Sequence, residues 1–209
     1  AAMKECRVPL VSANIVDRSL RKPVAPPFVV KDLDGASRLF GRVGAVRVGI
    51  FSVALPGFVY RAGDAGSKRY SVVDPKLSSL EAVTKLRSRG CDLVVAISHQ
   101  GWQQSLALAR DVPGIDLVLN GHSSHKRSFS ERVGSTVVVD TGDKERSFTE
   151  VTVTFSGDSL SVAAADVCDA LLASPGDPRF LDLQRDYEKE IKEYNRARMT
   201  RNAGTKTKR

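Results

Sequence analysis

Three histidines, His99, His122 and His125, are the side chains whose type and spacing could support chemistry. All three lie in one stretch, residues 91–125, and each stands where a loop should begin. Imidazole nitrogen is the commonest protein ligand for zinc and similar metals, so three converging histidines could hold one ion. Three histidines in 209 residues are no enrichment, so ordinary loop histidines, solvated or hydrogen-bonded to the backbone, remain the alternative.

The segments around these histidines predict how they meet. Residues 92–98 form a short apolar, β-branched run suited to a buried strand, and His99 follows it directly. Residues 100–111 carry apolar residues at helical spacing, and residues 115–119 predict a second buried strand. This order indicates a β-α-β unit whose strands are parallel and joined by a right-handed crossover. Both histidine-bearing loops should therefore leave the carboxyl edge of one sheet, where open α/β sheets place their ligands.

Three short motifs resemble one protein family in their residue types and order. They are Ser-Ala-Asn at 12–14, Ser-His-Gln-Gly at 98–101 and Gly-Ile-Asp-Leu-Val-Leu-Asn-Gly-His-Ser at 114–123. Together they resemble the calcineurin-like metallophosphoesterases of the 5′-nucleotidase type, over about residues 8 to 155. The resemblance implies an α/β fold, a β-sandwich flanked by helices, and metal-dependent hydrolysis of phosphomonoesters, above all nucleotides. The related activity that the resemblance also implies is hydrolysis of cyclic nucleotides by a phosphodiesterase.

The resemblance also implies roles for individual residues. His99 matches the histidine of the family's Ser-His-x-Gly motif, and His122 matches the first histidine of Gly-His-x-His. The next ligand would stand at Ser124, whose neutral hydroxyl is a poor substitute for imidazole, and His125 could replace it if the loop bulges. The predicted metal ligands are therefore His99, His122 and His125, and no catalytic or substrate-binding residue is assigned.

Asp116 and Asn14 are the predicted supporting residues. Asp116 could orient a metal ligand through a hydrogen bond, and it is at least as well suited to capping a turn or pairing at the strand end. For Asn14, a hydrogen-bonding role at a strand end is the alternative to a place behind the metal. The implied cofactors are two divalent ions, zinc, manganese or similar, about 3.5–4 Å apart, which clamp phosphate oxygens during in-line attack. This chain alone would hold one ion or none.

The main departure from the family concerns its earlier motifs. Asp-x-His, Gly-Asp and Gly-Asn-His supply most ligands of the two-metal centre and the catalytic histidine, and they precede the Ser-Ala-Asn strand. No histidine precedes His99 in this chain. The chain is therefore expected to be the C-terminal half of a phosphoesterase domain, incomplete as an enzyme by itself. The alternative is a non-catalytic, degenerate half-domain that acts as a binding module. In either case a partner chain or a second copy is expected to cover the exposed edge of the sheet.

The rest of the chain predicts further strands and one clear helix. Asp74 as N-cap and Pro75 at the first helical position begin that helix, and Gly90 ends it. Its buried stripe is expected at Leu77, Leu80, Val83 and Leu86. Strands are expected at 8–16, 28–32, 46–54 and 136–140, a loop at 55–70, and a hairpin at 148–155 and 159–167.

Composition and charge indicate a globular domain with a distinct C-terminal end. Hydrophobic residues make up 42% of the chain and charged residues 27%, as in soluble globular proteins. Residues 1–170 are expected to form the phosphoesterase-like domain, residues 178–199 a charged helix and residues 200–209 a basic, disordered tail. Most of the net charge of +8 resides in residues 196–209, which are rich in lysine and arginine. Nucleic-acid binding through this tail is disfavoured, because no binding signature accompanies it.

The sequence carries few signals of the cellular location and redox environment of the protein. No apolar run approaches the ~20 residues that a membrane helix needs, so no membrane association is expected. Residues 1–6 show no signal peptide, whereas the family resemblance suggests a periplasmic or secreted protein. Cys6, Cys91 and Cys168 form no Cys-x-x-Cys pair. They are expected to be small hydrophobic fillers, with a disulfide as the alternative.

Overall fold

The computed structural model describes residues 8–33, 46–56, 69–123, 128–142, 147–156, 159–168 and 177–206. Two compact units make up the chain, Ala1–Cys168 and Asp169–Arg209. All the described strands belong to the first unit, and the described part of the second contains one long helix. No helix within the described ranges is both long and apolar enough to cross a membrane.

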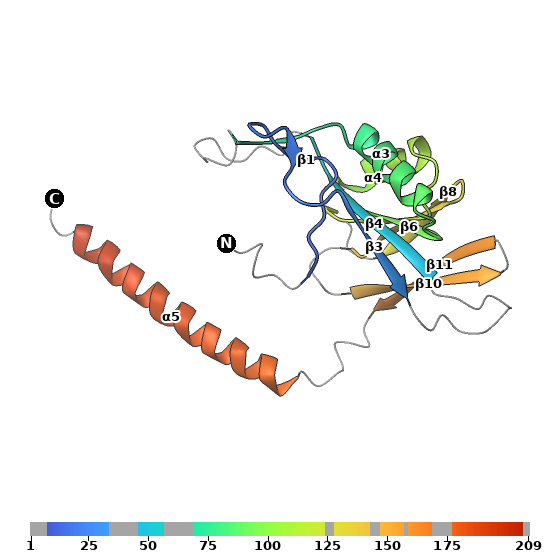
Figure 1. Cartoon of the computed structure of the whole chain (residues 1–209). Helices are drawn as coiled ribbons and strands as arrows, with labels where there is room; N and C mark the ends of the chain where they lie inside the picture. The colour runs from blue at the N-terminus through green and yellow to red at the C-terminus, as the bar shows by residue number, and fades with distance from the viewer. Residues whose placement is uncertain are drawn as a thin grey trace. The chain divides into compact units, whose positions relative to one another are not determined.

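A six-stranded mixed sheet forms the centre of the first unit (Figure 1). Its four middle strands are parallel, and one antiparallel strand lies at each edge. The order is β3 (Phe28–Leu33), β4 (Val46–Ala54), β6 (Leu93–His99), β7 (Leu117–Asn120), β9 (Thr136–Asp140) and β8 (Phe129–Val133). Valine, isoleucine and leucine prevail in the parallel strands because such strands are covered on both faces. The predicted strands in this sheet are confirmed, and β8 is an addition to them.

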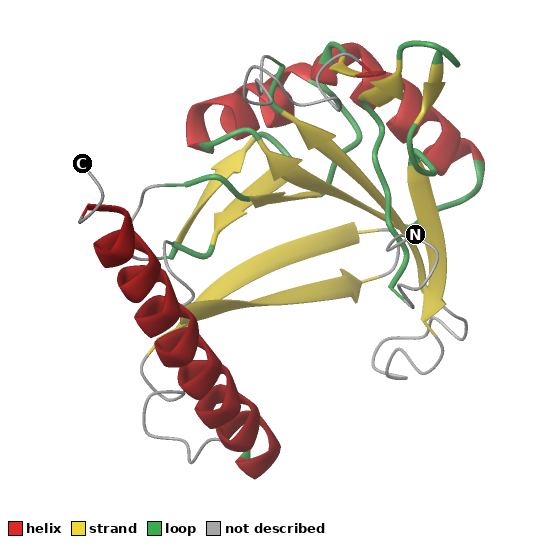
Figure 2. Ribbon diagram, turned by 90° about the vertical axis from the view of Figure 1, so that its left-hand side faces the viewer, coloured by secondary structure: helices red, strands yellow, loops and turns green. Residues whose placement is uncertain are grey.

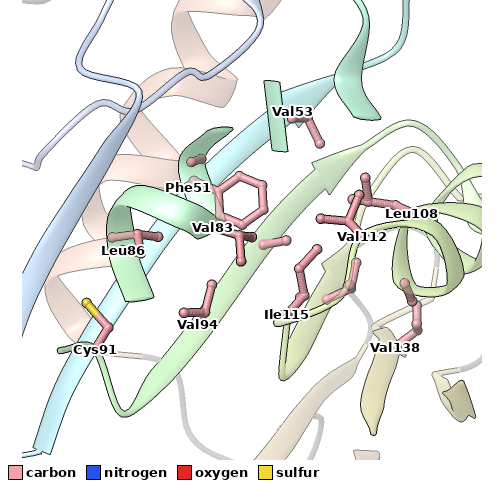
Figure 3. Packing of buried hydrophobic residues seen from close by; sticks show 14 of the residues in the cluster. Phe51, Val53, Val83, Leu86, Cys91, Val94, Leu108, Val112, Ile115 and Val138 are labelled. Carbon is pink, nitrogen blue, oxygen red and sulfur yellow. The ribbon is translucent and has the colours of Figure 1, made fainter. Parts of the chain in front are cut away.

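Two layers cover this sheet, one on each face (Figure 2). The helices α3 (Pro75–Ser88) and α4 (Trp102–Asp111) lie on one face, and the hairpin of β10 (Ser147–Ser156) and β11 (Ser159–Cys168) lies on the other. Phe51, Leu86 and Val94 are fully buried on the helix side (Figure 3). Val95 and Val139 face the hairpin, where they pack with Val162 of β11. The predicted α/β sandwich flanked by helices is therefore confirmed.

Helix α3 begins as predicted, and its buried stripe matches the prediction except at Leu77. The Asp74 carboxylate accepts hydrogen bonds from the backbone N–H groups of Lys76 and Leu77, at 2.7 and 3.1 Å. Leu77 itself is 65% exposed, so its place in the predicted stripe is wrong. Nine steps of about 100° each place Leu77 on the opposite side of the helix from the buried Leu86. Val83 and Leu86 are buried as predicted, Leu80 packs against the same core, and Ala82 joins this face.

The N-terminal segment does not form the long strand predicted at 8–16. β1 (Ile15–Asp17) has three residues and pairs with β2 (Lys22–Pro23) and β5 (Tyr70–Val72) in a small antiparallel sheet. Residues 11–13 instead attach to β4, where Ala13 N donates to Ser52 O at 2.8 Å and Ser52 Oγ donates to Val11 O at 2.6 Å. β5 begins at the last residue of the predicted loop 55–70, of which residues 57–68 are outside the described residues.

The helix of the second unit is longer than predicted. α5 runs from Pro178 to Lys206, so residues 200–206 of the expected disordered tail are helical, and residues 207–209 are outside the described part. The backbone N–H of Arg179 donates to the Asp177 carboxylate at 2.9 Å, which caps the first turn. The following large apolar residues are exposed on this helix: Phe180, Leu181, Leu183, Tyr187, Ile191 and Tyr194.

Cys91 has the filler role predicted for the cysteines. It is 5% exposed and belongs to the core cluster on the helix side. Burial raises the pKa of its thiol, with a smaller opposing effect from the nearby Arg47 guanidinium. A thiol with a raised pKa is a weak nucleophile, so this cysteine suits packing rather than chemistry.

Candidate metal centre at the carboxyl edge of the sheet

The predicted β-α-β unit brings two histidines together. β6 and β7 are adjacent and parallel, with Ser98 paired to Asn120 at their carboxyl ends. His99 is the last residue of β6, and His122 follows β7 by two residues. The centroids of their rings lie 5.0 Å apart, with the ring planes tilted by 55°. Both side chains are exposed, so the pair is accessible from solvent.

Glycines and an unusual backbone angle make this approach possible. Gly121 N donates to Ser98 O at 2.7 Å, which draws the second histidine loop against the end of β6. A Cβ at Gly121 would lie 3.3 Å from Nδ1 of His99, tighter than an ordinary contact, so a side chain here would press on that ring. His122 has φ +61°, a left-handed conformation that costs a non-glycine residue free energy. Strain of this kind is concentrated at functional sites.

The ring separation fits one shared metal ion. A zinc–nitrogen bond of ~2.1 Å and tetrahedral ligation place two coordinated imidazole centroids about 5.2 Å apart. The 5.0 Å between the ring centroids of His99 and His122 is close to that separation. Two imidazoles therefore fit a single divalent ion as part of its ligand set.

The two-metal centre of the resembled family needs more than this pair. Within the described residues, no group of three or more histidine, cysteine, aspartate or glutamate side chains could hold a metal. Ser124 and His125 lie outside the described residues, so the predicted third ligand stays a prediction. Imidazole does not bridge two ions as a carboxylate does. The described residues thus fit one ion and do not complete a two-ion site.

Asn14 lies beside the histidine edge and acts on the backbone. Its side chain is fully buried, and its Nδ2 donates to Ala54 O at 2.8 Å and to Val73 O at 3.0 Å. Its Oδ1 accepts from Ala54 N at 2.9 Å. Because Ala54 pairs with His99 in the sheet, Asn14 joins three segments next to the first histidine. The hydrogen-bonding role at a strand end is therefore observed, and a place behind the metal stays a prediction.

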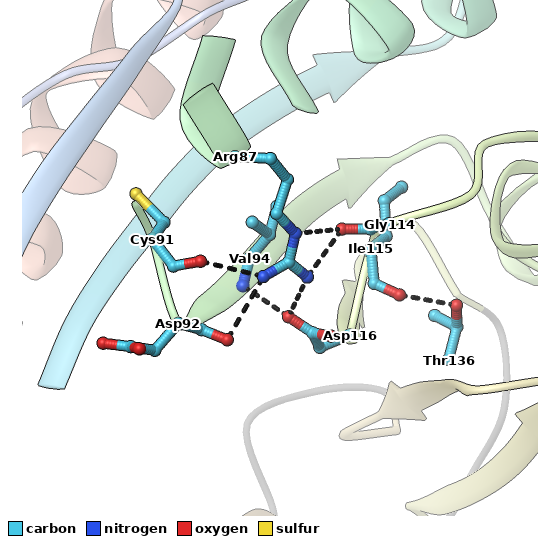
Figure 4. A network of polar contacts seen from close by, with 8 residues as sticks. All are labelled: Arg87, Cys91, Asp92, Val94, Gly114, Ile115, Asp116 and Thr136. Atoms are coloured by element: carbon cyan, nitrogen blue, oxygen red, sulfur yellow. Dashed lines mark hydrogen bonds and ion pairs between the residues drawn. The ribbon is translucent and has the colours of Figure 1, made fainter. Parts of the chain in front are cut away.

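Asp116 lies at the wrong edge of the sheet for the predicted role. It precedes β7, whereas the histidines follow the strands, so about 13 Å of strand separate it from His122. Its Oδ2 accepts hydrogen bonds from Arg87 Nη2 at 2.6 Å and from Val94 N at 2.7 Å (Figure 4). The prediction that Asp116 orients a metal ligand is thus corrected: it pairs at the amino-terminal edge and ties α3 to the sheet.

A buried polar cluster beneath the histidines escaped prediction. Ser98, Asn120 and Asp140 occupy the carboxyl ends of three neighbouring strands, and Ser105 of α4 lies between them. All four side chains are buried. The available sequence signal was a polar residue ending each of three apolar runs, a pattern that gains meaning only when the strands are known to be neighbours.

Comparison with known proteins relates the chain to phosphoesterases. No protein-family model matches it. It is 25% identical over 131 residues to a 2′,3′-cyclic-nucleotide 2′-phosphodiesterase/3′-nucleotidase from Salmonella typhimurium, which covers 58% of this chain and 20% of that protein. The chain therefore spans about a fifth of the length of the curated relatives it matches.

Solved structures share its fold. The 5′-nucleotidase precursor from Thermus thermophilus superposes with a TM-score of 0.71 at 22% identity, over 91% of this chain and 39% of that one. A calcineurin-like phosphoesterase from Bacillus subtilis superposes with a TM-score of 0.69 at 19% identity, over 92% of this chain and 65% of that one. The chain has the fold of these phosphoesterases.

Proposed function

We propose that this chain, a relative of the calcineurin-like phosphoesterases of the nucleotidase type, forms the histidine side of a metal-dependent site that hydrolyses phosphate esters of nucleotides. The observation that carries the proposal is the pair of His99 and His122, 5.0 Å apart between ring centroids at the carboxyl edge of the sheet. The named activity of the relatives, on 2′,3′-cyclic nucleotides and 3′-nucleotides, indicates the substrate class.

The two imidazoles would hold one divalent ion, zinc, manganese or similar, between β6 and β7. Such an ion supplies charge neutralisation at the phosphate and a nucleophilic water at neutral pH. The carboxylate ligands of a two-metal centre would come from polypeptide outside the described residues. This assignment agrees with the comparison, because the chain spans only about a fifth of the length of the curated relatives it matches.

An uncovered part of the sheet indicates where that polypeptide would lie. Ile97 sits two residues after the buried Val95, on the same face of β6, yet it is 43% exposed. His99 continues this face and is also exposed. The β10–β11 hairpin thus covers the beginning of β6 on this face and leaves its end open, among the described residues. A partner segment, or a second copy of the chain, that carries carboxylates is the proposed occupant.

Metal titration tests the proposal directly. The wild-type chain is expected to bind one equivalent of Co²⁺, measured by calorimetry and by the absorption bands of the bound ion. His99→Ala and His122→Ala should each weaken binding by more than the about 10–100-fold typical of changes outside the ligand shell. Asp116→Asn is the matched control and should bind as the wild type does, because that residue lies at the other edge. Binding that survives both histidine changes would refute the proposal.

A non-catalytic half-domain is the second candidate. The observation that favours it is Ser124, which stands where the resembled family has a ligating side chain. Hydrolysis of 2′,3′-cyclic AMP, 3′-AMP and 5′-AMP with added Mn²⁺ distinguishes the candidates. Turnover that disappears in His122→Ala would establish catalysis by this chain. Metal binding without turnover would favour either a half-site or the binding module.

The location of the protein, periplasmic or secreted, stays a prediction from the family resemblance.

A further inference from the structure

A chain of buried side-chain hydrogen bonds runs directly beneath the two histidine loops. Gln100 Nε2 donates to Ser98 Oγ at 3.1 Å, and Ser98 Oγ lies 2.8 Å from Ser105 Oγ. Ser105 Oγ lies 2.6 Å from Asn120 Oδ1, and Asn120 Nδ2 donates to Asp140 Oδ2 at 2.7 Å. All five side chains are at most 7% exposed, so this network is closed off from solvent.

The donors in this network point in one direction. A carboxylate only accepts, so the Asn120 amide turns its Nδ2 to Asp140 and its Oδ1 to Ser105. The single hydroxyl proton of Ser105 goes to Asn120, because that carbonyl oxygen cannot donate. Ser105 must then accept from Ser98, which in turn accepts from Gln100. The Asp140 carboxylate therefore sets the orientation of every group in the network.

The network joins the segments that carry the histidines. Ser98 immediately precedes His99, and Asn120 stands two residues before His122. Ser105 links α4 to both strand ends, and the second oxygen of Asp140 accepts from Gly142 N at 2.7 Å. At the other end of β9 the comparable polar residue, Thr136, donates a single side-chain hydrogen bond, to Ile115 O at 2.7 Å. The extended network is thus placed at the histidine edge, where the relative position of two loops matters.

We infer that Asp140 is a positioning residue for the His99–His122 pair. It orders the network from Gln100 to Asn120 and so holds the ends of β6 and β7 at the register that places the two rings 5.0 Å apart. The use of this pair in metal binding rests on the proposed function, but the positioning itself does not.

Exchange of the groups at positions 120 and 140 gives a sharp test. In Asp140→Asn the amide meets two donors, Asn120 Nδ2 and Gly142 N, with one oxygen, so one donor is left facing an amide N–H. In Asn120→Asp two carboxylates face each other. The double variant Asn120→Asp/Asp140→Asn restores every hydrogen bond: the carboxylate at position 120 accepts from Ser105 and from the new amide, whose oxygen accepts from Gly142 N.

The readout is NMR of the chain with isotope-labelled histidine, where His99, His122 and His125 give the three ring signals. The wild type should show a nuclear Overhauser effect between the rings of His99 and His122. Asp140→Asn should weaken this effect and shift both ring signals, the double variant should restore them, and Thr136→Val should change neither. Ser105→Ala breaks the network in its middle and is the replacement if Asp140→Asn does not fold. Unchanged ring signals in folded Asp140→Asn and Ser105→Ala would overturn the inference.

Co²⁺ titration of the same variants separates this inference from the proposed function. Asp140→Asn should weaken binding about tenfold, the size of other changes behind metal ligands, and the double variant should recover it. If the wild type binds no Co²⁺, the proposed function fails while the NMR comparison still decides the positioning role. If Asp140→Asn binds Co²⁺ as the wild type does, the positioning role fails and the metal site stands.

Discussion

Arg87→Met is expected to lower the free energy of unfolding by more than is usual for the substitution of a partly exposed residue. The Arg87 guanidinium donates to Gly114 O at 2.9 Å, to Cys91 O at 2.9 Å and to Asp92 O at 3.2 Å (Figure 4). It also pairs with the Asp116 carboxylate at 2.6 Å, with 34% and 17% of the two side chains exposed. One side chain of α3 thus holds the starts of β6 and β7 at the edge opposite the histidines.

The magnitude follows from this partial burial. Breaking a buried ion pair costs about 3–5 kcal/mol, and an exposed pair contributes about 0–1 kcal/mol. The Arg87–Asp116 pair lies between these cases, and water can reach some of the freed carbonyl groups. Methionine keeps an unbranched apolar stem and a similar helix propensity, and it removes the guanidinium. We therefore expect the free energy of unfolding to fall by about 2–3 kcal/mol.

Urea denaturation followed by circular dichroism measures this loss. Lys85→Met is the matched control on the same helix, because its pair with Glu81 is exposed on both sides and contributes only about 0.3–0.5 kcal/mol. Arg87→Met combined with Asp116→Asn should cost less than the sum of the two single changes. A loss below about 0.5 kcal/mol in Arg87→Met would refute the view that this guanidinium ties α3 to the strand starts.

Two further predictions concern packing and pH. Gly49→Ala would place a Cβ 2.7 Å from Cδ2 of the fully buried Leu86. Because the core would be overpacked, the free energy of unfolding should fall by about 1–3 kcal/mol, seen as a lower urea midpoint at an unchanged slope. A variant as stable as the wild type would contradict this contact. The hydrogen bond from the Ser19 hydroxyl, followed by that from the Arg69 guanidinium, holds the pKa of Asp17 well below its usual range. A lowered folded-state pKa contributes stability above the unfolded pKa of about 3.9, and this contribution is lost as the pH falls toward the folded value. Between about pH 5 and pH 2 the wild type should therefore lose more stability than Asp17→Asn, and equal losses would exclude Asp17 as a source of the acid sensitivity.

The sequence alone determined the elements that its local patterns encode. The strands at 46–54 and 136–140 were predicted with the bounds observed, and the N-cap at Asp74 was predicted correctly. The order of strand, helix and strand also predicted that His99 and His122 meet, because parallel neighbouring strands end at the same edge. These features depend on near neighbours in sequence and on a general rule of chain connection, so one sequence suffices for them.

Tertiary structure decided which face and which edge each remaining side chain reaches. Leu77 fits the apolar spacing of a buried helix face but is exposed. Asp116 precedes its strand and therefore pairs with Arg87 rather than supporting a histidine. The hydrogen bond between Asn120 and Asp140 joins residues 20 positions apart across two strands. No local pattern specifies such a contact, because it depends on strand order and on the direction of buried side chains. The histidines could be found in the sequence, whereas the network that holds them required the fold.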